Sequence, residues 1–416
     1  MGIRAPLVLP SGLHLENRLV KSAMTEGLAT DDSLPSEALL RLYGRWASSG
    51  AGMLVTGNVG IDAAHPVRPR DVILGDDAPF APFEAWARVA KGGGAKVVMQ
   101  LNHGGRQTPR FVNARPLGPS SGAAVKMFGA FGEPREATAL EIADIVRRHA
   151  VAAAFAERAG FDGVQVHAAH GYLLNQFLAP DINRRTDEWG GAIANRARLL
   201  IDCIRAVREA TGGGFTVGVK LNAGDFLRGG FAEDDALEVV AMLAKEKIDF
   251  LEISGGRYES GASFGHATPS AEEGYFLSFA RKARGLIDVP LLLTGGLRTR
   301  AAMDAALDDD ALDLVGIARP MTLAPDYPRR LLSGDALPPI RSRKLGVAAL
   351  EGPAELAWYY WQLARMGAGR EPDPTVSAWR ALAWFTTSDA FVALRHRLRA
   401  WEGPRLCRLL PMYQQH

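Results

Sequence analysis

The sequence predicts an α/β fold, a (β/α)8 TIM barrel that carries an N-terminal β-hairpin and a C-terminal helical extension. Short runs rich in Val, Ile, Leu and Met recur along the chain, and segments with helical periodicity separate them. Strands that alternate with helices pair in parallel, because parallel neighbours need a crossover connection. Eight such runs are present, and this number favours a closed barrel over an open sheet, since closure leaves no edge strand.

Each strand is expected where a short apolar run is followed by a helical pattern. The eight runs are Leu19–Met24, Met53–Val59, Lys96–Leu101, Gly163–His167, Thr216–Leu221, Phe250–Ile253, Leu291–Thr294 and Leu312–Ile317. The segments between them, such as EALLRLYGRWASSG and DDALEVVAMLAKEK, place apolar residues on one helical face. Before the first run, LVLPSGLHLENR predicts a hairpin that turns at Ser11 and Gly12, and we expect it to close the barrel floor.

The character of the chain changes after about residue 335, so we expect a barrel over 1–335 and a helical extension over 336–416. LPPIRSRKLG reads as a linker, and two amphipathic segments after it carry five of the eight tryptophans. Such aromatic stripes are typical of packing faces. We therefore expect contact with the barrel or with a second copy of the chain, which would make a homo-oligomer; the alternative is a lid over the substrate.

Composition narrows the classes of partner and compartment. The 416 residues have a formal net charge of +2 with dispersed Lys and Arg, so neither a nucleic acid nor an anionic membrane is an expected partner. No uncharged apolar stretch reaches the roughly 18 residues of a spanning helix, and no signal peptide is recognisable, so we expect a cytoplasmic protein that acts on a small molecule. Cys203 and Cys407 lie far apart without CxxC spacing, which excludes a disulfide framework and a four-cysteine zinc or iron-sulfur site.

Functional groups of a TIM barrel lie at the carboxyl ends of its strands. This rule predicts that the residues at all eight strand ends lie at the same open end of the barrel. They are Thr25, Asn58, Gln100, His103, His167, His170, Tyr172, Lys220, Ser254, Gly295, Gly296, Ala318 and Arg319.

The residue types in this ring indicate a bound nucleotide. Gly295, Gly296 and Arg319 follow the last two strands, where barrels commonly hold a phosphate. Gln100 offers a donor beside an acceptor and suits the edge of a heteroaromatic ring, while Lys220 would stabilise negative charge on that ring. Thr25 can donate a hydrogen bond to its other side, and together these groups describe FMN. The alternatives are a plain glycine turn, a strand-end cap at Thr25, a core amide at Gln100 and a surface cation at Lys220.

Five motifs in order along residues 3–335 carry a family resemblance. KSAMTE, VMQLNHGGR, HAAHGYLLNQFLAPDINRRTDEWGG, NRAR and GIARPM make the chain similar to the Old Yellow Enzyme family of flavin-dependent ene-reductases. The resemblance implies noncovalent FMN on a barrel and NADH or NADPH as the reductant. It also implies that hydride passes through the flavin to the activated C=C bond of an α,β-unsaturated carbonyl compound.

The resemblance also implies roles for particular residues. His167 and His170 would bind the substrate carbonyl oxygen, and Tyr172 would donate the proton. Lys220 stands where many members have arginine, and Asn58 stands where others have a small residue. Tyr258, Phe264 or Tyr275, in the loop after the sixth strand, would line the substrate side. The residues implied for FMN are Ala23, Met24, Thr25, Asn58, Gln100, Lys220, Gly295, Gly296, Ala318 and Arg319.

Other interpretations of the same residues stay open. A metal bound by the two histidines is not favoured, because no nearby carboxylate in the sequence completes a site. Lys220 beside a phosphate site could instead form a Schiff base, which would make the protein an aldolase or lyase acting on a phosphorylated substrate. A third hypothesis is a noncatalytic barrel whose C-terminal helices form a docking surface.

Overall fold

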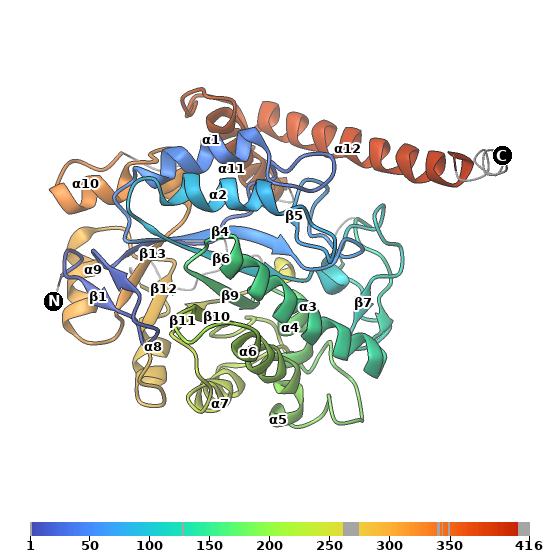
Figure 1. The fold of residues 1–416 in the computed structure, drawn as a ribbon, viewed down its shortest axis with the longest axis horizontal. Helices are drawn as coiled ribbons and strands as arrows, with labels where there is room; N and C mark the ends of the chain where they lie inside the picture. The colour runs from blue at the N-terminus through green and yellow to red at the C-terminus, as the bar shows by residue number, and fades with distance from the viewer. Residues whose placement is uncertain are drawn as a thin grey trace, which may run out of the picture.

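The computed structural model describes residues 2–126, 129–260, 274–338, 342, 344–347 and 350–406, with side chains up to residue 392. Eight parallel strands close into a barrel (Figure 1), because β3 pairs with both β13 and β4. The predicted fold class is therefore confirmed. The barrel strands are β3 (Leu19–Lys21), β4 (Met53–Gly60), β6 (Lys96–Asn102), β9 (Gly163–Ala168), β10 (Thr216–Asn222), β11 (Phe250–Ser254), β12 (Leu291–Thr294) and β13 (Leu314–Ile317).

The strand bounds agree closely with the sequence prediction except at the first and last strands. β3 ends at Lys21 instead of Met24, since the chain leaves the ladder there and carries Met24 and Thr25 to the barrel mouth. The last strand begins at Leu314 instead of Leu312, because Asp313 ends the preceding turn and donates its N–H to Leu291.

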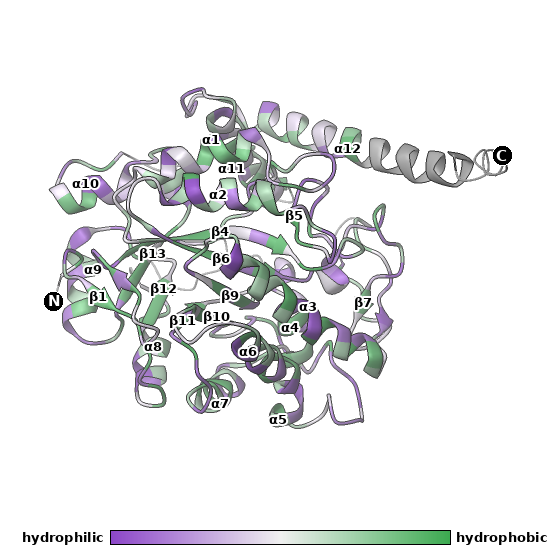
Figure 2. Cartoon of the chain, viewed as in Figure 1, coloured by the Kyte–Doolittle hydropathy of each residue, from purple (hydrophilic) through white to green (hydrophobic). Residues whose placement is uncertain are grey.

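A helix follows each barrel strand and covers the sheet. Figure 2 shows that the strands are mostly hydrophobic, whereas the surrounding helices carry both kinds of residue. α3 begins at a capping box in which Thr138 and Glu141 satisfy each other's backbone N–H groups. The helices that follow the strands are α1 (Glu37–Ala47), α2 (Phe80–Lys91), α3 (Ala139–Arg158), α6 (Arg198–Ala210), α7 (Glu233–Leu243), α8 (Leu277–Arg284), α9 (Arg300–Asp308) and α10 (Tyr327–Ser333).

The predicted N-terminal hairpin is present. β1 (Leu7–Val8) pairs antiparallel with β2 (His14–Leu15), and the turn places Gly12 at φ +86°, a conformation that glycine adopts without strain. Leu9 and Leu15 are buried in one cluster with the interior residues Val98 and Phe250, so the hairpin fills the barrel floor. This packing leaves the carboxyl ends of the strands as the open end of the barrel.

Two helices follow the barrel, α11 (Glu351–Gly367) and α12 (Ala378–Leu406). α11 packs against α1, and Arg41 donates a hydrogen bond from its Nε to the carbonyl of Gly367 at 2.8 Å. Trp358 is fully buried and donates to the carbonyl of Val376, which joins α11 to the turn before α12. None of the described helices is both long and apolar enough to cross a membrane.

Candidate active site

The barrel mouth holds a cavity of about 200 Å³ that is partly open to solvent. Five residues predicted from the strand ends and the following loops line it together: Met24, Thr25, Tyr172, Tyr258 and Arg319. The opposite side comes from α11, a segment that the sequence predicted to pack on the barrel or on a second copy, with a lid over the substrate as the alternative. The α11 residues are Gly352, Glu355, Leu356, Tyr359, Tyr360 and Leu363.

The two predicted histidines lie beside Tyr172, just below this cavity. The ring centroids of His167 and His170 are 5.5 Å apart, and those of His167 and Tyr172 are 4.9 Å apart, both in edge-to-face contact. His170 adopts φ +59°, which is uncommon for a residue with a side chain. Asn222 accepts the backbone N–H of His170 at 3.2 Å and helps to hold this turn. The strand end of β9 therefore gathers the three groups as the sequence predicted.

His167 is a neutral hydrogen-bond donor. Burial lowers its pKa well below the usual value, and the nearby imidazole of His170 and the charge of Lys220 lower it further. Its Nδ1 accepts the backbone N–H of Ala169 at 3.1 Å. The single proton of the neutral ring therefore lies on Nε2, which can donate it to a ligand oxygen.

His170 has both ring nitrogens engaged by the protein. Its Nδ1 lies 3.3 Å from the carbonyl of Gly256, which only accepts, so Nδ1 carries the proton. Burial and the charge of Lys220 lower the pKa of His170 to about 3, so the ring is neutral and Nε2 accepts from the hydroxyl of Ser254 at 3.2 Å. In this arrangement Nε2 of His170 is not available as a donor to a ligand.

Tyr172 is hydrogen-bonded to Tyr258. The two hydroxyl oxygens are 2.8 Å apart, and Tyr258 comes from the loop after β11. Burial, followed by the neighbouring Tyr258, raises the pKa of Tyr172 well above the usual value. The phenol of Tyr172 therefore stays protonated at neutral pH.

A chain of polar side chains crosses the barrel interior below the mouth. The amide of Gln100 donates to Gln165 at 2.6 Å, and Gln165 donates to Glu252 at 2.7 Å. The other oxygen of Glu252 lies 2.9 Å from Nζ of Lys220. Lys220 is thus a buried cation paired with Glu252, and the alternative of a surface cation is wrong. Glu252 and Gln165 could have been identified from the sequence, because each is a polar residue at an inward position of an otherwise apolar strand.

Lys21 is a second buried cation, which was not predicted from the sequence. Lys21 donates to the carbonyl of Val55 at 2.8 Å, and its Nζ lies 4.4 Å from the ring centroid of Trp46. Burial lowers its pKa to about 8, although Glu26 opposes this effect. Glu26 in turn accepts hydrogen bonds from the hydroxyl of Tyr43 and from the N–H of Gly57, so these groups hold the segment that leads to Thr25.

At the predicted phosphate-binding site, after β12, the backbone has a conformation that only glycine adopts readily. Gly295 and Gly296 have φ of +116° and +85°, and a Cβ on Gly296 would lie 2.8 Å from the ring of Tyr275. Within the described ranges, no acceptor takes their backbone N–H groups. Tyr275 lies here and not beside the histidines. The Arg319 guanidinium lies 3.4 Å from Glu355 of α11 and remains half exposed.

These residues fit FMN. Two unbonded backbone N–H groups and an exposed guanidinium suit a phosphate, and the interior cation of Lys220 with the amide of Gln100 suits an electron-poor ring. Asn58 is buried and pairs in register with Gln100, while Ala23 packs on the barrel interior. Phe264 lies outside the described residues.

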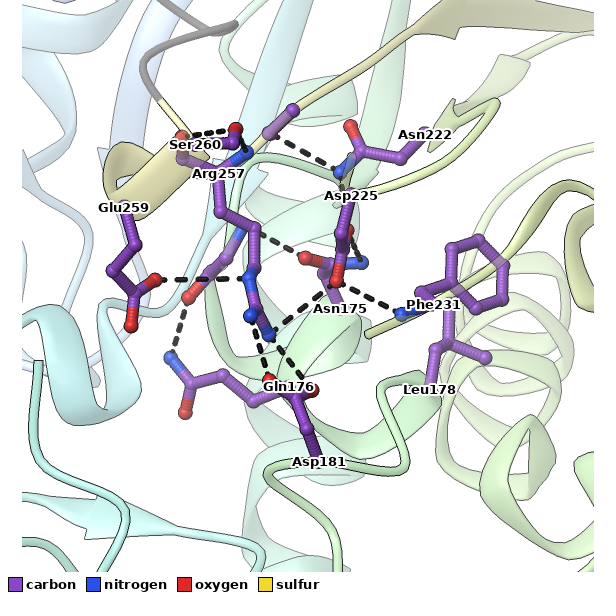
Figure 3. Close-up of polar contacts among 12 residues, drawn as sticks. Asn175, Gln176, Leu178, Asp181, Asn222, Asp225, Phe231, Arg257, Glu259 and Ser260 are labelled. Carbon is purple, nitrogen blue, oxygen red and sulfur yellow. Dashed lines mark hydrogen bonds and ion pairs between the residues drawn. The ribbon is translucent and has the colours of Figure 1, made fainter. Parts of the chain in front are cut away.

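The loops around the histidines are joined by a network of charges centred on Arg257, which Figure 3 shows between acidic side chains. Its guanidinium makes two bonds to Asp181, at 2.9 and 2.7 Å, and lies 3.4 Å from Asp225. Asp225 also accepts from Asn222, the residue that holds His170. The neighbouring Glu259 binds Arg106 at 2.7 Å. The network therefore fixes the loops after β6, β9, β10 and β11 relative to one another, and it was not predicted from the sequence.

A histidine cluster near β4 has the ligand types of a metal site but the wrong protonation pattern. Asp62, His65 and His103 have their ligand atoms within 4.8 Å of one another. Nε2 of His65 accepts the N–H of Leu117, and Nδ1 of His103 accepts the N–H of Gly105. The nitrogens that face Asp62 therefore carry the protons. Although burial raises the pKa of Asp62, hydrogen bonds from both histidines bring it well below the usual value. The cluster is therefore a hydrogen-bonded structural group that joins the segments around Asp62, His65 and His103.

Comparison with known proteins places the chain in a family. Residues 4–337 match the model of the NADH:flavin oxidoreductase / NADH oxidase family. The chain is 39% identical over 355 residues to the NADH-dependent flavin oxidoreductase iliE of Hypocrea jecorina, covering 79% of this chain and 88% of that protein.

Solved structures of similar proteins support the same assignment. The old yellow enzyme homologue from Zymomonas mobilis superposes with a TM-score of 0.70 at 26% identity, over 81% of this chain and 94% of that one. Morphinone reductase in complex with tetrahydroNAD superposes with a TM-score of 0.68 at 28% identity, over 81% of this chain and 92% of that one. The chain therefore belongs to the NADH:flavin oxidoreductase / NADH oxidase family, which confirms the resemblance, the enzyme class and the FMN cofactor.

Proposed function

We propose that this flavin oxidoreductase passes hydride from NADH, through FMN, to the activated C=C bond of an α,β-unsaturated carbonyl compound. One observation carries the proposal: a protonated phenol, Tyr172, lies beside a neutral imidazole, His167, whose Nε2–H is free to donate. Bound FMN supplies the hydride. NADH is proposed as the reductant because iliE is named as NADH-dependent.

The protein groups supply the other half of the chemistry. A hydrogen bond from His167 to the substrate carbonyl oxygen withdraws electron density and makes the β-carbon a better hydride acceptor. Tyr172 then delivers its proton to the α-carbon, so that hydride and proton together saturate the double bond. Tyr258, which is 2.8 Å from Tyr172, stabilises the phenolate that is left.

The role proposed for His170 needs one local change. The carbonyl of Gly256 holds the proton on Nδ1, while Ser254 occupies Nε2. His170 can become a second donor to the carbonyl oxygen only when the ring gives up these contacts and moves the proton to Nε2. We propose that ligand binding drives this change.

The alternative of a Schiff-base aldolase is not favoured. Lys220 is buried in the barrel and held 2.9 Å from Glu252, so its amine is engaged in an ion pair and is not placed to attack a substrate carbonyl. The hypothesis of a noncatalytic barrel is wrong, because the family consists of oxidoreductases.

The test is a two-step experiment on the holoprotein. The protein is first reduced with NADH without oxygen and is then mixed with 2-cyclohexen-1-one while flavin absorbance is followed. We expect the enone to reoxidise the flavin in proportion to its concentration and to yield cyclohexanone. A reoxidation rate equal to that in buffer alone would contradict ene-reduction while leaving the family assignment intact.

A further inference from the structure

The cavity that contains Tyr172 has two walls of different origin. Tyr172, Tyr258 and Thr25 come from the barrel strands and loops, whereas Leu356, Tyr359 and Glu355 come from α11, beyond the residues that match the family model. The wall opposite the proposed proton donor is therefore built by the C-terminal extension.

α11 is held to the barrel mouth by a clamp centred on Arg68, in the loop after β4. The guanidinium of Arg68 stacks 3.7 Å from the ring centroid of Tyr360 and 4.3 Å from that of Phe385. It also makes two hydrogen bonds of 2.9 Å to Asp389 of α12. A planar guanidinium that is stacked and paired in this way fixes both helices with a defined geometry.

Additional contacts fix α11 at both ends. Glu355, in its first turns, pairs with Arg319 at the phosphate end, and Gly367, at its last turn, accepts from Arg41 of α1. Between these points Leu363 and Met366 are buried in the main core. α11 thus packs on the barrel, as expected from its aromatic residues. It also lines the cavity at the mouth, a position that would suit the alternative of a cover over the substrate.

The chemistry of the cavity selects a class of ligand. Met24, Thr25 and Arg319 are among the residues that fit FMN, and the rest of the lining includes four tyrosines and the apolar side chains of Leu356 and Leu363. Its charged groups, Arg319 and Glu355, form a pair with each other. Phenol rings and apolar side chains favour flat uncharged molecules, which can stack on them without losing solvation of a charge.

We propose that α11 is the specificity wall of the active site, and that Leu356 and Tyr359 select uncharged ring ketones by the size of their ring system for the reaction at Tyr172. The inference rests on the proposed ene-reduction for the chemistry, but the binding of ketones can be measured without turnover. Leu356 sets how large a ring system enters, because it is the apolar side chain of α11 between Glu355 and Tyr359 that faces the cavity.

The experiment measures ligand binding to the oxidised holoprotein by titration calorimetry. Cyclohexanone and 1-tetralone serve as a small and a bicyclic ketone, neither of which has a double bond that the enzyme could reduce. In Leu356→Trp we expect 1-tetralone to bind at least about tenfold more weakly while the affinity for cyclohexanone changes less than about threefold. Leu356→Phe should give an intermediate loss of affinity for 1-tetralone. This variant keeps the test decisive if the tryptophan of Leu356→Trp disturbs folding.

Ala368→Trp is the matched control, because it adds the same ring at the exposed C-terminal end of α11. It should leave the affinities for both ketones unchanged. Equal losses for both ketones in Leu356→Trp, unchanged 1-tetralone binding, or no binding of 1-tetralone by the parent protein would overturn the proposal. If the parent protein binds both ketones with the expected selectivity but does not reduce cyclohexenone, the specificity wall stands and the proposed reaction fails.

Discussion

The hydroxyl oxygens of Tyr172 and Tyr258 lie 2.8 Å apart, so a hydrogen bond joins two phenols that come from different barrel loops. Tyr172 follows β9, and Tyr258 follows β11 next to Arg257, the centre of the buried charge network. The position of the proposed proton donor therefore depends on the packing of several loops and not on β9 alone.

Replacing Tyr172 by phenylalanine should separate the two half-reactions. The ring packing on His167 remains but the proton is lost, so we expect enone turnover to fall by about 10² to 10⁴. Reduction of the flavin by NADH should change less than about threefold, because it needs no proton from Tyr172. Stopped-flow absorbance of each half-reaction is the measurement, with Tyr275→Phe as a control phenol placed at the other end of the site. Equal losses in both half-reactions would remove the acid role.

Ser254→Ala tests the proposed switch of His170. The variant lacks the hydroxyl that occupies Nε2 of His170, so a carbonyl ligand no longer competes with it. A net hydrogen bond is worth about 1 kcal/mol, and we therefore expect cyclohexanone to bind about fivefold more tightly. Ser254→Thr keeps the hydroxyl and should bind like the parent protein. Weaker or unchanged binding in Ser254→Ala, measured by calorimetry, would show that His170 keeps its present contacts when the ligand binds.

Glu252→Gln should lower the stability of the barrel. The change removes the carboxylate that lies 2.9 Å from Lys220 and leaves a buried cation without its counter-charge. Breaking such a pair typically costs about 3–5 kcal/mol of unfolding free energy. Urea titration of the holoprotein measures the loss, and Glu233→Gln is the control, because its pair with Lys282 is exposed and should contribute under about 1 kcal/mol. Similar stabilities for the two variants would mean that the interior pair is not charged.

The protein should lose stability as the pH falls from 7 to about 4. Burial lowers the pKa of His103 and His149 to about 4 and that of His170 to about 3, so these rings stay neutral in the folded chain while the unfolded chain binds protons below about 6.5. The unfolded state then carries more protons, and the unfolding free energy decreases by up to about 1.4 kcal/mol per pH unit for each histidine.

Urea midpoints at pH 7, 6 and 5 check this slope. His14→Gln should not alter it, because His14 is half exposed beside Glu16. A midpoint that stays constant over this range would show that the buried histidines are already protonated at neutral pH.

The periodicity of the chain was sufficient to predict the barrel and the residues at its mouth. In a parallel barrel all strands end on the same side, so the residues that follow the strands lie near one another. Gly163–His167 and Thr216–Leu221 were placed within one residue of the observed bounds, and Tyr172, Thr25 and Arg319 do share one cavity. Local pattern carries this information, since each strand and its following helix are encoded within one short segment.

Long-range pairing could not be deduced in the same way. The partner of Lys220 is Glu252, on the next strand, and nothing in either segment alone says that both side chains point inward at the same level. Arg68 and Asp389 are 321 residues apart, so the clamp over α11 has no signature in any window of the sequence. The apolar face of α11 predicted that it packs, but not that it packs across the mouth.

The N-terminal hairpin has a consequence at the far end of the molecule. Leu9 and Leu15 fill the base of the barrel, and among the described residues the cavity at the opposite end is bounded on one side by α11. In the proposed reaction NADH and the enone would use this cavity in turn, so the oxidised coenzyme would depart before the second substrate arrives. Such a ping-pong cycle makes an excess of NADH an inhibitor that competes with the enone.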